Sequence, residues 1–162
     1  KYNYDYSKIE PKIKNTQQFN YNDLLIISKK FINTTKKNNS LFYFYNIFNK
    51  KFYKIYFKLT DLNKNYFFDF DKGLIEIDFV ENYNPICKLD SESLYQLFSS
   101  GYGYDALIIG GRFEANKEGL KSLDKIFKFQ AKNYQNIFYN YKYLYLKILN
   151  MLLSTNKIYH KR

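Results

Sequence analysis

Apolar residues recur at helical spacing in the first part of the chain. Leu24, Ile27 and Phe31 lie three and four residues apart, which places them on one face of a helix. Asn22 or Asp23 can accept a hydrogen bond from the first helical turn. The pattern therefore predicts an amphipathic helix that ends in the polar, lysine- and asparagine-rich stretch that follows.

From residue 52 onward the period changes to two. Apolar and polar side chains alternate over 52–62, 66–70 and 74–80, with turn-forming residues between these segments. Short turns connect neighbouring antiparallel strands, so the pattern predicts a meander. An edge strand is predicted over 85–89, because a proline is tolerated where an edge strand begins. The uncharged, aromatic segment 41–48 fits either a strand or a short buried helix.

Four of the six glycines cluster just after the middle of the chain. Glycine serves where φ must be positive or where a close neighbour excludes a Cβ, so the cluster marks demanding backbone geometry. It follows a helix that Asp90 or Ser91 can cap and that is predicted to stop at residues 99–101. A mobile or tight Gly-Tyr-Gly-Tyr turn, an apolar run over 106–109 and a last short strand over 112–115 are predicted next.

Two more helices complete the predicted chain. Asn116 can cap the first, and the second is a long amphipathic helix from Tyr134 to about Leu153. Helices and strands in this order predict an α+β fold with a mostly antiparallel five-stranded sheet covered on one face by helices.

Three regions follow from these patterns. Residues 1–20 show no sustained period and are predicted to form an irregular arm or linker. Residues 21–131 are predicted to form the α+β domain, and residues 132–162 a basic helical extension. The chain begins with Lys1, which leaves open that it is a fragment of a larger protein.

The net charge of +11 is distributed unevenly. Residues 1–60 hold twelve lysines and three acids, residues 61–124 are acidic on balance, and residues 125–162 hold eight basic residues and no acid. Basic ends can contact phosphates or an anionic membrane surface. An AT-rich genome would also raise Lys, Asn, Ile, Phe and Tyr together. Arginine, which binds phosphate bidentately, occurs only twice, and this favours the compositional explanation.

The residues needed for most hydrolytic and metal-dependent chemistry are scarce. One histidine, His160, and one cysteine cannot build a His-rich zinc site or a cysteine cluster, and no motif nominates a nucleophile. We therefore expect no cofactor, and an enzyme acting alone is the least supported class. The carboxylates of Asp69, Asp71, Glu76 and Asp78 can bind a divalent cation or act as an acid and base, but a solvated strand face explains them better.

Aromatic residues make up 22% of the chain. Interleaved with lysine, they can form a stacking platform for single-stranded nucleic acid, although alternating aromatic residues are more often core. Their number exceeds what one small core readily hides. The surplus indicates a ligand cavity, a protein partner or a membrane-facing surface.

The segments 57–62, 73–77, 88–98 and 106–113, taken with the order of the elements over 22–130, resemble the sterol carrier protein family. In that family a strand leads into a helix that begins with Asp or Ser, and a later glycine precedes a short strand at the mouth of an apolar tunnel. The glycine-rich run also looks like the C-terminal module of certain metallo-β-lactamase-fold hydrolases, whose metal-binding motif this chain lacks.

The resemblance implies non-catalytic binding of an apolar, lipid-like ligand, or an accessory role beside a metal-dependent hydrolase domain. Nucleic-acid binding, as in a ribonucleoprotein subunit, and peripheral membrane binding stay open as alternatives. The single cysteine, Cys87, is compatible with a reducing compartment, so the expected location is the cytoplasm or an organelle interior, with attachment at a membrane surface left open. Arg112 can clamp an anion or, as the preferred interpretation, pair with Asp105. The candidate ligand-lining residues, each of which also fits a place in the core, are Leu94, Leu97, Phe98, Tyr102, Tyr104, Leu107, Ile108, Phe113, Leu123 and Phe127, and the candidate mouth residues are Gly103, Gly110, Gly111 and Arg112.

Overall fold

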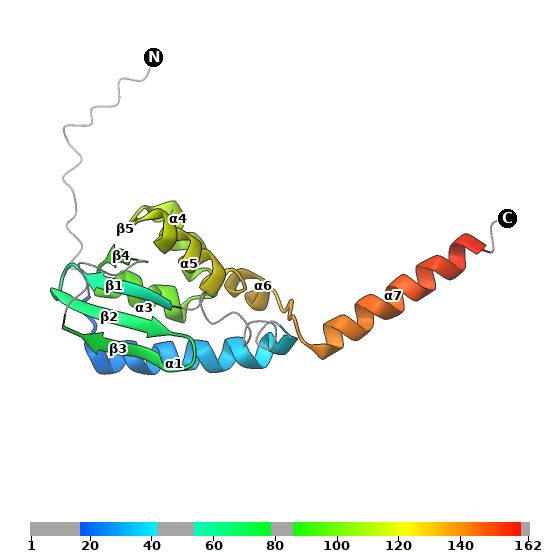
Figure 1. The fold of residues 1–162 in the computed structure, drawn as a ribbon, viewed down its shortest axis with the longest axis horizontal. Helices are drawn as coiled ribbons and strands as arrows, with labels where there is room; N and C mark the ends of the chain where they lie inside the picture. The colour runs from blue at the N-terminus through cyan, green and yellow to red at the C-terminus, as the bar shows by residue number, and fades with distance from the viewer. Residues whose placement is uncertain (1–16, 42–53, 79–85, 160–162) are drawn as a thin grey trace, which may run out of the picture.

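The computed structural model describes residues 17–41, 54–78 and 86–159, with side chains described as far as residue 153. These residues form an α+β body with a five-stranded sheet, and a long C-terminal helix leads away from it (Figure 1). The predicted fold class is therefore confirmed. The predictions for 1–16, 42–53, 79–85 and His160 lie outside the described residues.

The first three strands form the predicted antiparallel meander. They are β1 (Lys54–Leu59), β2 (Lys64–Asp69) and β3 (Gly73–Ile77). Phe57 on β1 lies opposite Tyr66 on β2, and both side chains are buried on the helix-covered face. The alternating sequence pattern thus sets which strand residues enter the core.

The fourth strand corrects the prediction of an edge strand. β4 (Ile86–Leu89) runs parallel to β1 and lies inside the sheet, whose order is β3-β2-β1-β4-β5. The edge position belongs to β5 (Phe113–Ala115), which pairs antiparallel with β4. The chain passes the β2–β3 hairpin and pairs with the open edge of β1. The short β5 then pairs with the remaining edge of β4. The spacing of residues in the sequence does not reveal this strand order.

Three capped helices cover one face of the sheet. They are α1 (Tyr21–Asn38), α3 (Ser91–Ser99) and α5 (Lys117–Phe127). The predicted caps Asp90 and Asn116 are confirmed, since their side chains accept hydrogen bonds from Ser93 N and Gly119 N. The cap of α1 predicted at Asn22 or Asp23 is wrong by two or three residues, because Asn20 Oδ1 accepts the hydrogen bond from Asp23 N at 3.1 Å.

A cluster of phenylalanines fills the space between this helical layer and the sheet. Phe31 on α1 contacts Phe98 on α3 and Phe127 on α5, with ring centroids 5.6 and 4.9 Å apart. Phe68 on β2 lies 5.1 Å from Phe98. Interlocking aromatic rings of this kind stabilise a core and leave little space inside it.

Three further helices follow α3. The glycine-rich turn and apolar run form one helix, α4 (Gly103–Gly110), which the sequence pattern did not predict. The long helix predicted from Tyr134 begins only at Tyr141, as α7 (Tyr141–Tyr159), and Tyr134 is the last residue of the short helix α6 (Gln130–Tyr134). The predicted start is wrong because Asn136 adopts a left-handed φ of 60°, which ends the helical path. None of the helices in the described part of the chain combines the length and apolar character needed to cross a membrane.

Three of the acidic side chains predicted on the meander have structural partners. Asp69 accepts a hydrogen bond from the backbone N–H of Asp71 at 2.8 Å, and Asp71 forms an ion pair with Lys36 at 3.4 Å. Glu76 pairs with Lys64 on the neighbouring strand. Within the described ranges, no group of three or more His, Cys, Asp or Glu side chains is arranged to hold a metal ion.

Candidate functional site

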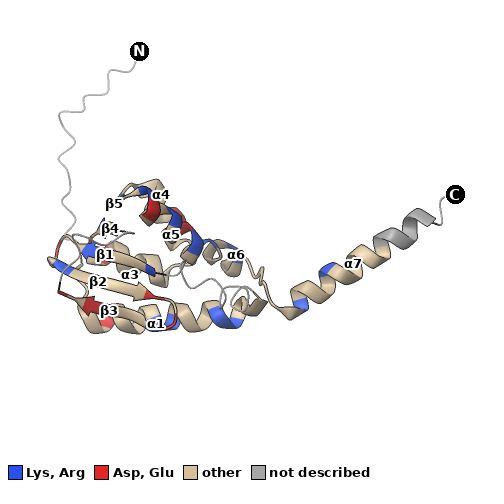
Figure 2. Ribbon diagram, viewed as in Figure 1, with Lys and Arg blue, Asp and Glu red and all other residues tan. Residues whose placement is uncertain are grey.

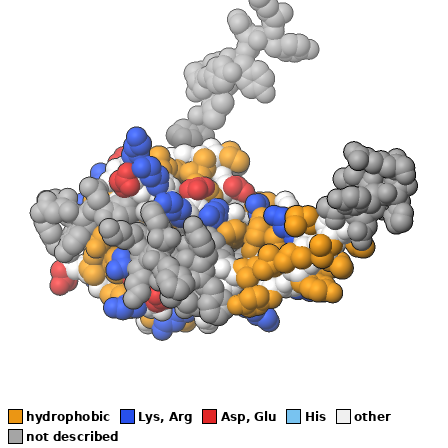
Figure 3. Space-filling model, turned by 45° about the vertical axis from the view of Figure 1, so that its right-hand side comes forward, with side chains coloured by type: hydrophobic (Ala, Val, Ile, Leu, Met, Phe, Trp, Pro, Cys, Tyr) orange, Lys and Arg blue, Asp and Glu red, His pale blue; other side chains and the backbone are white. Residues whose placement is uncertain are grey.

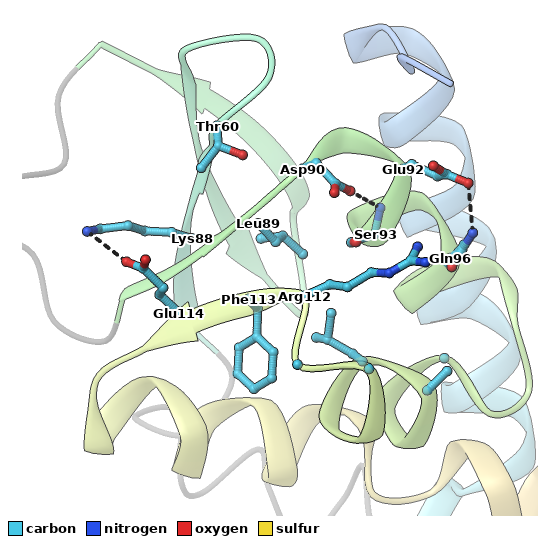
Figure 4. Close-up of a pocket in the computed structure, with 15 residues that line it drawn as sticks. Thr60, Lys88, Leu89, Asp90, Glu92, Ser93, Gln96, Arg112, Phe113 and Glu114 are labelled. Carbon is cyan, nitrogen blue, oxygen red and sulfur yellow. Dashed lines mark hydrogen bonds and ion pairs between the residues drawn. The ribbon is translucent and has the colours of Figure 1, made fainter. Parts of the chain in front are cut away.

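An open cleft of about 860 Å³ lies between α3, α4 and the β4–β5 pair. Figure 4 shows how these elements surround it. The cleft lies beside the phenylalanine core, not within it. It is lined by Thr60, Lys88, Leu89, Asp90, Glu92, Ser93, Gln96, Gly103, Ala106, Leu107, Gly110, Gly111, Arg112, Phe113 and Glu114.

Apolar side chains and glycines form part of the cleft wall. Leu89 from β4 and Leu107 from α4 are buried, and Phe113 from β5 is half-buried against the core. Ala106 is exposed on the cleft side of α4. The wall can therefore accept a hydrocarbon group without exposing the core.

Two glycines shape this wall in different ways. A Cβ on Gly103 would lie 2.5 Å from Gln96 O and 2.7 Å from Leu97 O, so glycine allows α4 to approach α3 closely. Gly111 has a φ of 60° and ends α4 in the left-handed conformation typical of a helix C-terminus. The chain then turns so that Arg112 enters the cleft.

Polar groups on the cleft rim are mostly occupied by neighbours. Lys88 Nζ pairs with Glu114 Oε2 at 3.3 Å across β4 and β5. Asp90 caps α3, and Gln96 Nε2 donates to Glu92 Oε1 at 3.1 Å. The rim thus carries three carboxylates and two basic groups, with the acids held by the protein itself.

Arg112 differs from the other rim residues. Its side chain is exposed and makes no hydrogen bond or ion pair with any residue that the structure describes. The predicted pairing with Asp105 is therefore absent from the structure. Figure 4 shows the side chain extended across the cleft toward Gln96 on α3. A guanidinium in this position has its donors available to a ligand.

The fourteen predicted residues, ten ligand-lining and four at the mouth, fall into three groups. Six of the fourteen lie on the cleft, and five are buried in the phenylalanine core, where no described cavity reaches most of them. Tyr102 and Ile108 are exposed outside the cleft, and Tyr104 is half-buried in the first turn of α4. The cleft group is Gly103, Leu107, Gly110, Gly111, Arg112 and Phe113, and the core group is Leu94, Leu97, Phe98, Leu123 and Phe127.

Sequence reasoning missed the α3 and β4 walls of the cleft. Glu92 and Gln96 are one helical turn apart on the face of α3 opposite Leu94 and Leu97, so helical periodicity places them together. Lys88 is the exposed residue between two buried neighbours on β4. The sequence pattern shows that these α3 and β4 residues lie on solvent-facing sides of their elements. Only the fold shows that the two sides meet at one cleft.

Burial changes the acidity of two groups near the cleft. Desolvation raises the pKa of the Cys87 thiol to about 12, because β4 holds it in the core. Burial also raises the pKa of Tyr104, with smaller contributions from Asp124 and Asp105. Neither group lines the cleft, and Cys87 is held as an unreactive thiol.

A second hollow of about 290 Å³ lies between α1, the end of α3 and α6. Ile27, Phe31 and Phe98 form its apolar side. Asn133 from α6 also lines it, and its Oδ1 atom is buried without a hydrogen-bond partner within the described residues. This hollow is about one third the size of the cleft.

Comparison with known proteins gives a limited result. No family model matches the chain, and no curated protein matches it. A solved structure described as "UbiJ-SCP2 Ubiquinone synthesis protein" is similar, with a TM-score of 0.47 and 9% sequence identity. The similarity covers 67% of this chain and 92% of that one.

Proposed function

We propose that this chain is a non-catalytic binding module that takes an amphipathic, lipid-like ligand in the cleft between α3, α4 and β4–β5. The observation that carries the proposal is the pairing of an apolar wall with an uncommitted arginine in one open cleft of about 860 Å³. This volume lies in the range of small-molecule sites, about 300–1,000 Å³.

The apolar part of the ligand would cover Leu89, Leu107 and Phe113. Burial of apolar surface contributes roughly 25 cal/mol per Å² before the costs of ordering the ligand. The phenylalanine core is already filled by side chains, so the tail is expected to lie along the cleft wall and not inside a tunnel through the core. Binding would therefore leave one side of the ligand accessible to water.

The polar part of the ligand would lie at the rim beside Arg112. A carboxylate or phosphate oxygen can accept hydrogen bonds from the guanidinium. The rim also holds Asp90, Glu92 and Glu114 against only two basic groups. A polyanionic headgroup would be repelled by this excess of acid, so a singly charged or zwitterionic headgroup fits best.

The first test is native mass spectrometry of the purified full chain, with extraction and identification of any bound molecule. Calorimetric titration with dodecanoate and with dodecylphosphocholine, each below its micelle concentration, then compares an anionic and a zwitterionic headgroup. We expect saturable binding of at least one of them.

A matched pair of variants on α4 locates the binding. Ala106→Trp places an indole in the cleft, whereas Ile109→Trp adds it to the same helix outside the cleft, at a side chain that is 86% exposed. Ala106→Trp should weaken binding at least tenfold and Ile109→Trp should leave it unchanged. Equal affinities of the two variants, or no binding by the unmodified chain, would refute the proposal.

The other functions predicted from the sequence have no equivalent support. A role beside a metal-dependent hydrolase and binding of nucleic acid stay predictions. The aromatic residues of the strands that are buried, including Phe57 and Phe68, form core contacts and are not presented for stacking on bases.

A further inference from the structure

Helix α7 leads away from the body and exposes apolar side chains over its whole described length. Figure 1 shows its direction, and Figure 3 shows hydrophobic side chains gathered over it. A monomeric protein in water rarely exposes an apolar surface of this extent without a binding partner. The large hydrophobic residues exposed on it are Tyr141, Tyr143, Leu144, Tyr145, Leu146, Ile148, Leu149, Met151, Leu152 and Leu153.

These residues are not spread evenly around the helix. Over residues 141–153, at 3.6 residues per turn, seven apolar side chains occupy an arc of roughly 160° that no polar residue interrupts. Lys142 and Lys147 lie at the two borders of this arc, and the remaining side carries Asn150 together with Tyr143, Leu146 and Leu153. The seven residues of the arc, hereafter the apolar arc, are Tyr141, Leu144, Tyr145, Ile148, Leu149, Met151 and Leu152.

The charge of this region has one sign. The last acidic residue of the chain is Asp124, and eight basic residues follow it. Figure 2 shows only basic colouring on the described part of α7. Long lysine side chains at the border of an apolar arc can reach lipid headgroups while their stems lie against hydrocarbon. Each lysine near an anionic lipid surface strengthens binding to it.

We propose that α7 docks in the plane of an anionic lipid surface, with the apolar arc turned toward the acyl chains. A basic helix with tyrosines and leucines on one face is suited to this interface. No described helix is suited to cross the bilayer, which favours binding in the plane. The proposal does not depend on the ligand cleft, because no residue of α7 lines it.

A second copy of the chain fits this surface less well. All charges on the described part of α7 are positive, so any self-pairing brings lysines toward lysines. The apolar arc is also wider than the seam of a two-stranded coiled coil, which uses two positions in seven. A lipid interface covers a wide arc and supplies the opposite charge.

The base of α7 is attached to the body, so docking would hold the body near the membrane. Leu41 N donates to Tyr139 O at 3.2 Å, and Tyr139 N donates to Asn39 Oδ1 at 3.3 Å. Asn140 Oδ1 then accepts a hydrogen bond from Tyr143 N and begins the helix. The segment before α7 is thus fixed to the end of α1.

Sedimentation of the full chain with vesicles tests the proposal. Vesicles of phosphatidylcholine alone are compared with vesicles that contain about 30% phosphatidylserine. We expect binding mainly to the anionic vesicles. Lys142→Gln with Lys147→Gln should reduce that binding by up to roughly thirtyfold, which corresponds to the usual contribution of two interfacial lysines.

Two double variants test the apolar arc. Ile148→Ser with Leu152→Ser removes side chains that are 47% and 55% exposed on the arc. Leu146→Ser with Leu153→Ser removes side chains that are 45% and 54% exposed on the opposite side. The first pair should lose at least tenfold in vesicle affinity, and the second, which removes a similar apolar surface, should lose much less.

The orientation of the helix can be read from tryptophan fluorescence, because the chain has no tryptophan of its own. Tyr145→Trp places the reporter on the apolar arc, and Tyr143→Trp places it on the other side. Anionic vesicles should shift only the emission of Tyr145→Trp to shorter wavelength.

Three results would overturn the proposal. One is equal loss of affinity by the two serine pairs, and another is an equal emission shift of the two tryptophan variants. The third is that the chain does not bind vesicles but forms a dimer, and that Ile148→Ser with Leu152→Ser makes it monomeric. This result would assign the apolar arc to a second copy. Loss of dodecanoate and dodecylphosphocholine binding would leave this proposal intact and affect only the cleft.

Discussion

The glycines at the two ends of α4 have different structural requirements. At Gly103 a Cβ would meet the backbone of Gln96 and Leu97, which cannot move without shifting α3. At Gly110 the nearest neighbour would be Arg112 Cγ at 3.7 Å, an ordinary contact with a flexible side chain. The value of glycine at each position therefore depends on packing and not on its place in a glycine-rich motif.

We expect opposite effects from alanine at these two positions. Gly103→Ala should destabilise the protein by about 1–3 kcal/mol, because overpacking against backbone displaces α4. Gly110→Ala should be neutral or stabilise by up to about 1 kcal/mol, because alanine favours the helix. Urea unfolding of both variants measures the difference. Equal effects would show that α4 does not approach α3 as closely as the structure describes.

At the scale of the element, α4 depends on a side chain from another helix. Its N-cap residue, Tyr102, makes no side-chain cap hydrogen bond. Instead, Tyr104 N donates to Gln130 Oε1 at 3.0 Å, and Gln130 Nε2 donates to Leu97 O at 2.5 Å. One glutamine on α6 thus satisfies the start of α4 and the end of α3.

Gln130→Ala should destabilise the protein by about 2–4 kcal/mol, because two backbone groups lose their partner near the core. The matched control is Gln135→Ala, which removes an exposed hydrogen bond to Tyr102 Oη and should change stability by less than about 0.5 kcal/mol. Urea unfolding free energies distinguish them. A loss of less than about 1 kcal/mol for Gln130→Ala would mean that water replaces the amide.

This dependence explains what the sequence could and could not predict. The starts of α3 and α5 can be predicted from the sequence, because Asp90 and Asn116 cap these helices by hydrogen bonds within the first turn. The meander follows from alternation, which is also local. Helix α4 has no local cap, contains β-branched Ile108 and Ile109, and is completed by Gln130, 26 residues from Tyr104.

The candidate site was predictable in part for the same reason. The glycine cluster located the α4 side of the cleft and Arg112, because unusual backbone geometry leaves a mark in the sequence. The walls from β4 and α3 were not found, since they meet α4 only after β4 inserts beside β1. For apolar residues such as Leu94 and Phe98, the sequence does not distinguish a side chain in the core from one that contacts a ligand.

At the scale of the whole molecule, α7 is expected to contribute little to the stability of the body. Its described side chains are exposed, and hydrogen bonds of Tyr139 join the segment before the helix to the body. Most of the stability of a helix in a protein comes from packing of its apolar face, and the described side chains of α7 are not packed against the body. The body should therefore fold and unfold as one unit whether or not α7 is present.

Truncation after Asn140 tests this separation. The truncated chain should keep its free energy of unfolding in urea to within about 1 kcal/mol, and its m value should fall only slightly, because m follows the surface exposed on unfolding. It should also keep its affinity for dodecanoate or dodecylphosphocholine and lose its affinity for anionic vesicles. A loss of several kcal/mol would instead show that the apolar arc packs against the body in solution, and that neither lipid nor another chain is needed to cover it.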